Sequence, residues 1–351
     1  MALMSPRGRR IRIVLSLLVL VTLAGCSPTA SMPTPPATPS PSYTSSYETP
    51  APVVYAPLTG LPVDDPASLE HPALAAKIDN LDVARPQYGI EATDLVFEEL
   101  VEGGLTRYVA VWHSNVPDEI GPVRSIRPMD PDIVSPLGGI VAYSGGQQRF
   151  VQLMRSTEVY NAVHGFDDTA DYMYRTREKA APHNVILRAG EFVEQHLDLA
   201  PPPQQYSYAE TAADATAARV GEPVAGVDLV FGVPSKPSWR WDAGSARWLR
   251  FQSGGAPDVD AHGDQLSAVN LVIVRVGVSN DRGVPKTELI GSGEAWVLTG
   301  GSVVSAVWSK DSRTAPIRLV DDTGAVIRLA PGNSWIELVP KSGSVTTVAS
   351  D

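Results

Sequence analysis

Two apolar runs in the first half of the chain, residues 94–101 and 105–112, have the composition of β-strands. They are rich in β-branched and aromatic residues, and the loop between them contains Gly103 and Gly104. A Gly-Gly pair strongly favours a two-residue hairpin turn because both residues can adopt positive φ. The pattern therefore predicts an antiparallel hairpin with its turn at the two glycines.

The position of this turn determines the expected register of the hairpin. A two-residue turn pairs Glu98 with Val109. Because successive side chains of a strand point to opposite faces, we expect Glu98, Glu102 and Arg107 on one face. Arg107 would then lie diagonal to both acids, within reach of their long side chains.

A predicted strand, two glycines and a predicted helix follow further along the chain. Residues 140–144 are apolar, and residues 147–155 carry apolar side chains at helical spacing. Gly145 and Gly146 lie between them, so bare backbone N–H groups would meet the start of a helix. Helix N-termini attract negative charge, so this arrangement predicts an anion site.

The second half of the chain has the pattern of short strands separated by turns. Trp239 and Trp241 alternate along one predicted strand, and Trp248 follows on the next. Core packing is the favoured interpretation for these tryptophans, and stacking on sugar rings is the alternative. Further apolar runs lie at residues 271–278, 295–299, 303–308, 317–320, 326–329 and 335–339. Strands of this length and spacing favour an antiparallel sheet, a barrel or a small sandwich.

These patterns predict an α+β protein with two domains. We expect an N-terminal mixed α/β domain at residues 56–199 and a C-terminal, mostly antiparallel β domain at residues 224–349. A linker at residues 200–223 would join them, since it contains three consecutive prolines and an alanine-rich stretch without apolar periodicity.

The N-terminus has the pattern of a targeting segment rather than of a folded element. Residues 1–25 contain four arginines and an apolar run shorter than the roughly 20 residues that span a membrane. The run ends in Leu23-Ala24-Gly25-Cys26, which resembles the bacterial lipobox. We expect residues 1–25 to be a signal peptide and Cys26 to carry the lipid, with palmitate among its fatty chains. Residues 26–55, rich in Pro, Ser and Thr, would form a disordered tether. An ordinary secretory signal and an uncleaved anchor are the alternatives.

Location and charge limit the partners of the folded part. A lipid on Cys26 would hold it at the outer face of the bacterial cytoplasmic membrane. The chain has a net charge of −11, and loss of the four signal-peptide arginines leaves 24 basic and 39 acidic residues, a charge of −15. So acidic a protein is a poor candidate for nucleic-acid binding.

The sequence also limits the possible cofactors. Cys26 is the only cysteine, which excludes a structural disulfide and a cysteine-based zinc site elsewhere in the chain. The sequence shows no metal-ligand pattern and no nucleotide phosphate loop. We therefore expect no metal and no cofactor.

Paired carboxylates are the first candidate for chemistry. Glu98 and Glu102 could act as acid and base if their environments separated their pKa values. Arg107 beside both would lower both pKa values, which favours a structural ion network instead. His183 is a weaker catalytic candidate, and a hydrogen-bonded structural role is the more common one for such a histidine.

The second candidate is an anion site built from arginines. Guanidinium groups bind carboxylate or phosphate in a bidentate manner. The expected members of the site are Arg107, Arg124, Ser125, Arg127, Gly145, Gly146 and Asn184. The alternative is that the arginines pair with the acidic segment at residues 61–120.

Several motifs together resemble those of the YerB-like lipoprotein family. They lie at residues 84–87, 98–107, 121–127, 144–146, 181–184, 291–295 and 332–336. The block Gly-Pro-Val-Arg-Ser, residues 121–125, is the most specific of them. The resemblance implies a two-domain extracytoplasmic lipoprotein of undefined function, and it supplies no catalytic residues.

We therefore expect a membrane-anchored protein that binds cell wall material, or a cell wall synthesis enzyme, through the arginine-rich site. A cell wall hydrolase or transferase that uses Glu98 and Glu102 is an alternative, and a solute-binding receptor is another. The sequence leaves open whether the protein is an enzyme.

Overall fold

The computed structural model describes residues 52–350, and these belong to one compact unit. The predicted signal peptide, Cys26 and all but the end of the predicted tether lie outside the described residues. Helices and strands mix in the N-terminal part, whereas strands dominate the C-terminal part. The prediction of an α+β fold is confirmed.

The largest sheet in the described residues contains 16 strands. Its path runs through β15 (Ser267–Ala268), β14 (Arg247–Phe251), β13 (Ser238–Asp242), β12 (Glu222–Val230), β19 (Ser302–Lys310), β18 (Gly291–Thr299), β16 (Asn270–Asp281), β22 (Ser334–Pro340), β4 (Leu95–Leu100), β5 (Thr106–Trp112), β3 (Leu74–Asp79), β7 (Ile140–Tyr143) and β8 (Tyr160–Val163). Off this path lie β17 (Val284–Glu288) on β16, β20 (Arg318–Val320) on β19 and β23 (Ser344–Ala349) on β12.

Smaller elements surround this sheet. The small sheets pair β1 (Val54–Tyr55) with β2 (Pro62–Val63), β10 (Val185–Arg188) with β6 (Glu119–Ile120) and β9 (Met173–Arg175), and β11 (Ser207–Tyr208) with β21 (Arg328–Leu329). The α-helices are α1 (Asp130–Val134), α2 (Gln148–Arg155), α3 (Ala189–Glu194) and α4 (Thr216–Val220). The 3-10 helices are η1 (Pro66–Leu69), η2 (Asp82–Ala84), η3 (Ile90–Ala92), η4 (Glu102–Gly104), η5 (Asp167–Asp171) and η6 (Ala212–Asp214).

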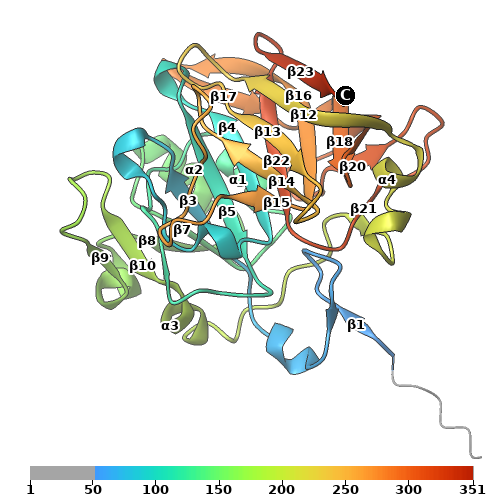
Figure 1. Ribbon diagram of the computed structural model, residues 1–351. Helices are drawn as coiled ribbons and strands as arrows, with labels where there is room; N and C mark the ends of the chain where they lie inside the picture. Colours follow the sequence, from blue (N-terminus) through green and yellow to red (C-terminus); the bar gives the residue numbers. More distant parts are fainter. Residues whose placement is uncertain (1–51, 351) are drawn as a thin grey trace, which may run out of the picture. The chain divides into compact units, whose positions relative to one another are not determined.

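Strand β22 joins the two halves of the chain in one sheet. It pairs in parallel with β16 on one side and with β4 on the other. In Figure 1 the strands of the early and late parts of the chain form one continuous layer around this junction. The predicted domain boundaries stay a prediction, and the predicted linker contains β11 and α4.

The central strands bury side chains on both of their faces. Val96 and Tyr108 pack into one apolar core, whereas Phe97 and Val109 pack into a second core on the opposite face. Strands covered on both faces have nearly continuous apolar sequences. A charged residue within such a strand must therefore find its partners inside the protein.

The predicted register of the β4–β5 hairpin is wrong by one residue. Glu98 lies opposite Tyr108, and Glu99 lies opposite Arg107. Both loop glycines do adopt positive φ, but Glu102 joins them in η4, so the connection has three residues rather than two. A slip of one residue exchanges the faces of a strand. Glu98 and Arg107 therefore point to opposite faces of the sheet.

The prediction of core positions for the tryptophans is confirmed for Trp239 and Trp248, which are fully buried. Trp241 is half-buried, with its ring 5.1 Å from that of Trp248. No helix in residues 52–350 is long and apolar enough to cross a membrane.

Candidate functional site

Two adjoining cavities lie where β3 and the β4–β5 hairpin end. The first, here called the polar cavity, has a volume of about 360 Å³ and is lined by Asn80, Arg85, Glu98, Arg250 and Gln252 among others. The second, here called the arginine cavity, has a volume of about 220 Å³. Its polar lining consists of Asp79, Glu102, Thr106, Arg107 and Arg127.

Arg250 on β14 holds the floor of the polar cavity in place. Its guanidinium nitrogens lie 2.6 Å from Glu98 Oε2, 3.0 Å from Asp258 Oδ2 and 3.2 Å from Glu337 Oε1. All four side chains are almost completely buried. Such a cluster is stable only when each charge keeps its partners, because unpaired ions are costly in an apolar interior.

Aromatic rings complete the surroundings of this guanidinium. The Arg250 carbon Cζ lies 4.8 Å from the ring centre of Trp335, 5.2 Å from Trp239 and 5.6 Å from Tyr108. Cations are attracted to aromatic faces at these distances. The attraction supports a structural role for Arg250, in which the protein itself supplies every partner.

Glu337 lies beside Glu98 because their strands, β22 and β4, pair in register at this point. Burial raises the pKa of Glu337 well above its ordinary value, and the neighbouring Glu98 raises it further. Trp239 Nε1 donates a hydrogen bond of 2.7 Å to Glu337 Oε1. Burial and the neighbouring carboxylate therefore both favour the protonated form of Glu337.

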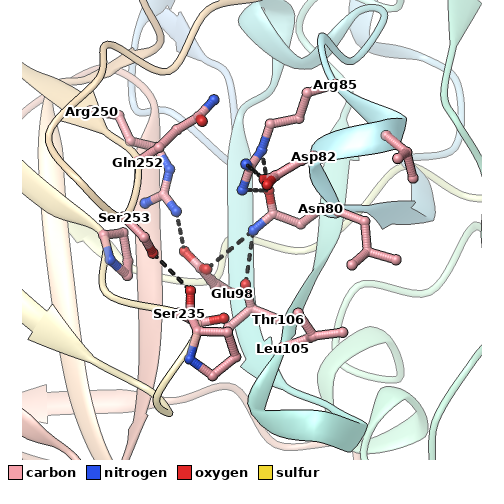
Figure 2. A pocket seen from close by; sticks show the side chains of 14 residues that line it. Asn80, Asp82, Arg85, Glu98, Leu105, Thr106, Ser235, Arg250, Gln252 and Ser253 are labelled. Atoms are coloured by element: carbon pink, nitrogen blue, oxygen red, sulfur yellow. Dashed lines mark hydrogen bonds and ion pairs between the residues drawn. The ribbon is translucent and has the colours of Figure 1, made fainter.

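Asn80 connects the floor of the polar cavity to its side. Its Nδ2 donates to Thr106 Oγ1 at 2.8 Å and to Glu98 Oε1 at 3.4 Å, and its Oδ1 accepts two hydrogen bonds from Arg85. Figure 2 shows Glu98 between Arg250 on one side and Asn80 on the other. The hydrogen bond from Asn80 is long, so Glu98 Oε1 can still accept a hydrogen bond from a group in the cavity.

Two of the three clustered arginines have carboxylate partners. Arg127 Nε lies 2.7 Å from Glu102 Oε2, and Arg124 Nε lies 2.9 Å from Asp79 Oδ2. Burial opposes ionisation of Glu102, but the hydrogen bond from Arg127, a backbone hydrogen bond and the charges of Arg127 and Arg107 together outweigh it, so the pKa of Glu102 is lowered. These pairs bear out the alternative in which part of the arginine segment binds the acidic segment.

Arg107 differs from both, because no carboxylate lies within 4.0 Å of it in residues 52–350. Its Nη1 donates one hydrogen bond of 2.9 Å to the carbonyl oxygen of Ser125. The residue is only 7% exposed, yet it lines the arginine cavity. Burial, and the nearby Arg127 and Arg124, lower the pKa of Arg107. A buried guanidinium with so few partners is unusual in a folded protein.

A second buried ion cluster lies on the same face of the sheet as Arg107. Lys77 pairs with Glu99 and lies 2.8 Å from Asp130, and all three side chains are buried. Burial lowers the pKa of Lys77 to about 8, against the opposing effect of Asp130. Together with the arginine cavity this face contains four cations (Lys77, Arg107, Arg124, Arg127) and four carboxylates (Asp79, Glu99, Glu102, Asp130). The charges on this face therefore balance, and an anion would be attracted by the position of Arg107 and not by net charge.

Comparison with known protein families shows which family this chain belongs to. The chain matches the family model of the N-terminal domain of a protein of unknown function, DUF3048, over residues 58–199, and that of the C-terminal domain over residues 227–336. The chain belongs to the DUF3048 family. The resemblance seen in the motifs is thereby confirmed.

A DUF3048 relative and its structure agree with this assignment. The chain is 25% identical over 296 residues to "Putative lipoprotein YerB" of Bacillus subtilis (strain 168). The matched region covers 81% of this chain and 86% of the relative. The crystal structure of YerB from Bacillus subtilis superposes with a TM-score of 0.71 at 21% identity, over 84% of this chain and 99% of that one. The superposition shows a shared fold, and the family carries no established function.

The remaining predicted site residues of this DUF3048 protein lie away from the lining of the two cavities. Gly145 and Gly146 do precede α2, as predicted, and the Gly145 carbonyl accepts a hydrogen bond from Ile126 N. Asn184 binds Arg175 and the backbone of Thr176 in a neighbouring loop. Their role in anion binding stays a prediction.

His183 reaches the arginine cluster through a shared carboxylate, whereas Ser125 contacts it directly through its backbone. His183 Nδ1 lies 2.6 Å from Asp79 Oδ2, the same oxygen that pairs with Arg124. Ser125 contributes its carbonyl oxygen, which accepts from Arg107 and Arg127, rather than its hydroxyl. Both residues therefore position the cluster.

The structure separates the predicted acid and base. Glu98 belongs to the polar cavity with Arg250, whereas Glu102 pairs with Arg127 in the arginine cavity and keeps 39% of its side chain exposed. A role for the two as an acid–base pair stays a prediction that these positions do not favour.

Sequence reasoning missed the residues that organise the polar cavity, above all Asn80, Arg250 and Glu337. A signal for two buried charges was present. Glu337 interrupts the apolar run 335–339, and Lys77 interrupts the run 73–78. A charge inside a run buried on both faces indicates an internal partner.

Proposed function

We propose that this DUF3048 protein is anchored by a lipid on Cys26 at the outer face of the cytoplasmic membrane and binds anionic cell wall material through Arg107. The lipobox at residues 23–26 supports the anchor, and so does the lipoprotein description of the relative from Bacillus subtilis. An anchored protein meets wall polymers, because they lie in the layer next to the membrane.

The observation that carries this proposal is the unpaired guanidinium of Arg107 in a cavity. An ion that is 93% buried loses most of its hydration, and one backbone carbonyl offsets only part of that loss. A ligand carboxylate or phosphate could supply the missing charge and several charge-assisted hydrogen bonds. The positive charges of Arg124 and Arg127 act on Arg107 in one sense and the negative charges of Asp79 and Glu102 in the other, so the unpaired position of Arg107, and not net charge, favours an anion here.

Carboxylates of peptidoglycan stem peptides, and phosphates of teichoic acid or of lipid headgroups, are the anions available at this location. Arg107 can bind either in a bidentate manner, because its fork of N–H donors matches both geometries. The wall polymer is the proposed occupant. If the partner were a wall synthesis enzyme instead, the protein would not sediment with purified sacculi in an Arg107-dependent manner.

Cosedimentation with purified cell wall sacculi tests this proposal. The mature chain from residue 26, carrying Cys26→Ser to prevent acylation, should sediment with sacculi in a salt-sensitive manner. Arg107→Gln should weaken retention at least tenfold, because a charge-assisted hydrogen bond is worth about 1.5–3 kcal/mol. Arg318→Gln is a matched control, since Arg318 is exposed on β20 and lies outside the lining of both cavities.

Equal retention of the wild type and Arg107→Gln would overturn the proposal. Sacculi stripped of teichoic acid distinguish the two anions, because only phosphate-dependent binding should then be lost. Release of soluble wall fragments by the wild type, but not by Glu98→Gln, would instead favour the hydrolase.

A further inference from the structure

The polar cavity and the arginine cavity share part of their lining. Leu81, Leu105 and Thr106 line both. One ligand could therefore occupy the two cavities together, with a different chemical group in each. The polar cavity, at about 360 Å³, falls in the range of roughly 300–1,000 Å³ that small-molecule sites occupy.

The polar cavity is suited to hydroxyl groups. Glu98 Oε1 can accept a hydrogen bond from a ligand, and Arg85 and Gln252 present guanidinium and amide groups nearby. Arg250 holds the Glu98 carboxylate at 2.6 Å, so this acceptor is fixed before a ligand binds. Pro234 and Pro237 add apolar surface to the lining.

Each cavity lining contains two arginines and two carboxylates. In the polar cavity Arg85 pairs with Asp82 and Arg250 pairs with Glu98, whereas Arg107 in the arginine cavity has no carboxylate within 4.0 Å among residues 52–350. An anionic group therefore finds a cation without a carboxylate partner only beside Arg107 in these two linings. A ligand with a neutral hydroxyl-bearing part and an anionic part therefore has one favoured orientation.

From this arrangement, and on the basis of the proposed function, we propose that the ligand is a sugar unit that carries a carboxylate or phosphate substituent. The sugar hydroxyls bind Glu98 and Asn80 in the polar cavity. The anionic substituent binds Arg107 in the arginine cavity. Leu81, between the two, contacts the ring where its substituent begins.

Isothermal titration calorimetry on the Cys26→Ser mature chain tests this inference with five probes. N-acetylmuramic acid combines a sugar with a carboxylate, and N-acetylglucosamine 1-phosphate combines a sugar with a phosphate. Lactate supplies the carboxylate alone, inorganic phosphate supplies the phosphate alone, and N-acetylglucosamine supplies the sugar alone. We expect one of the two combined probes to bind at least tenfold more tightly than either of its single-group counterparts, and the stronger of the two identifies the anion.

Variants assign each half of the ligand to its cavity. Glu98→Gln should weaken binding of the combined probe and of N-acetylglucosamine while leaving lactate and phosphate unchanged. Arg107→Gln should weaken binding of lactate, phosphate and the combined probe only. Leu81→Trp fills the shared lining without disturbing the Arg250 cluster, so it should abolish the tenfold advantage even if Glu98→Gln fails to fold. Val326→Trp, at a half-exposed position outside both linings, is its control.

The outcomes separate this inference from the proposed function. If lactate or phosphate binds through Arg107 and the sugar adds no affinity, the inference is overturned and the anion site stands. If no probe binds in an Arg107-dependent manner, both are overturned. If the combined probe keeps its advantage in Leu81→Trp, the sugar does not span the two cavities, and the inference is likewise wrong.

Discussion

Arg250 and Arg107 are two buried arginines with opposite surroundings. Arg250 is 1% exposed and contacts three carboxylates and three aromatic rings. Arg107 is 7% exposed, and within the described residues it has a single carbonyl partner and no carboxylate within 4.0 Å. The two residues line adjoining cavities, so the difference in their partners is set by the side chains directly around each one.

The difference teaches how to separate a structural charge from a binding charge. Arg250 uses three of its five N–H donors on buried carboxylates, and aromatic rings surround its guanidinium. Arg107 uses one donor, on a backbone carbonyl, and its other donors are available to a ligand in the cavity. Incomplete satisfaction, more than burial or positive charge, therefore marks the candidate site.

The largest expected effect comes from removing the arginine with three carboxylate partners. Arg250→Met leaves Glu98, Asp258 and Glu337 buried without their cation, and loss of one partner of a buried pair costs about 3–5 kcal/mol. We expect at least this loss in the free energy of unfolding, measured by urea denaturation. Arg318→Met, at an exposed strand position, should change it little. A loss as small as the control's would contradict the structural role.

Lys77 provides an intermediate case, with two carboxylate partners. Lys77→Met should lower the free energy of unfolding by about 3 kcal/mol, less than Arg250→Met, because fewer buried carboxylates lose their cation. The same urea experiment measures both variants. A loss equal to or larger than that of Arg250→Met would show that the number of partners does not determine the cost.

The raised pKa of Glu337 predicts a pH dependence of stability. The folded pKa of Glu337 is raised, so between its unfolded pKa of about 4.3 and its higher folded pKa the native state binds the extra proton, and stability falls as pH rises. Glu337→Gln mimics the protonated form and removes this fall. Relative to the wild type, the variant should gain stability as the pH rises above the unfolded pKa. If Glu337→Gln is instead less stable than the wild type throughout the neutral pH range, Glu337 is ionised in the native state.

The smallest expected effect on stability comes from the unpaired arginine. Arg107→Met removes one hydrogen bond, to Ser125, but also removes a buried cation without a carboxylate. These changes oppose one another, so the free energy of unfolding should change by less than about 1 kcal/mol. Thermal unfolding of the two proteins, without added anion, measures the difference. A loss as large as that of Arg250→Met would show that Arg107 is structural.

The sequence predicted the local features of this fold better than its long-range ones. The family, the mixed and strand-rich parts, and the helix after Gly146 followed from motifs and periodicity. The neighbourhood of Glu98 did not, because it depends on the pairing of β4 with β22, more than 200 residues away along the chain. The hairpin register failed because Glu102 joined the loop, a choice that the Gly-Gly signal alone does not reveal.

The candidate site shows the same division. The sequence predicted that Arg107, Arg124 and Arg127 would gather, and the structure brings all three to one face of the sheet. Distances of a few ångströms between side chains from separate elements determine which of the three arginines lacks a carboxylate partner. No spacing along the chain contains that information.

The most direct measurement follows the Nε–Hε resonances of the two arginines by NMR while inorganic phosphate is added to the Cys26→Ser mature chain. Arg107→Lys and Arg250→Lys assign the two signals by their absence. A saturable shift of the Arg107 signal, with the Arg250 signal unchanged, is the predicted result. If the Arg107 signal stays in place, or if both signals drift together without saturating, Arg107 does not bind anions and the distinction between the two arginines fails.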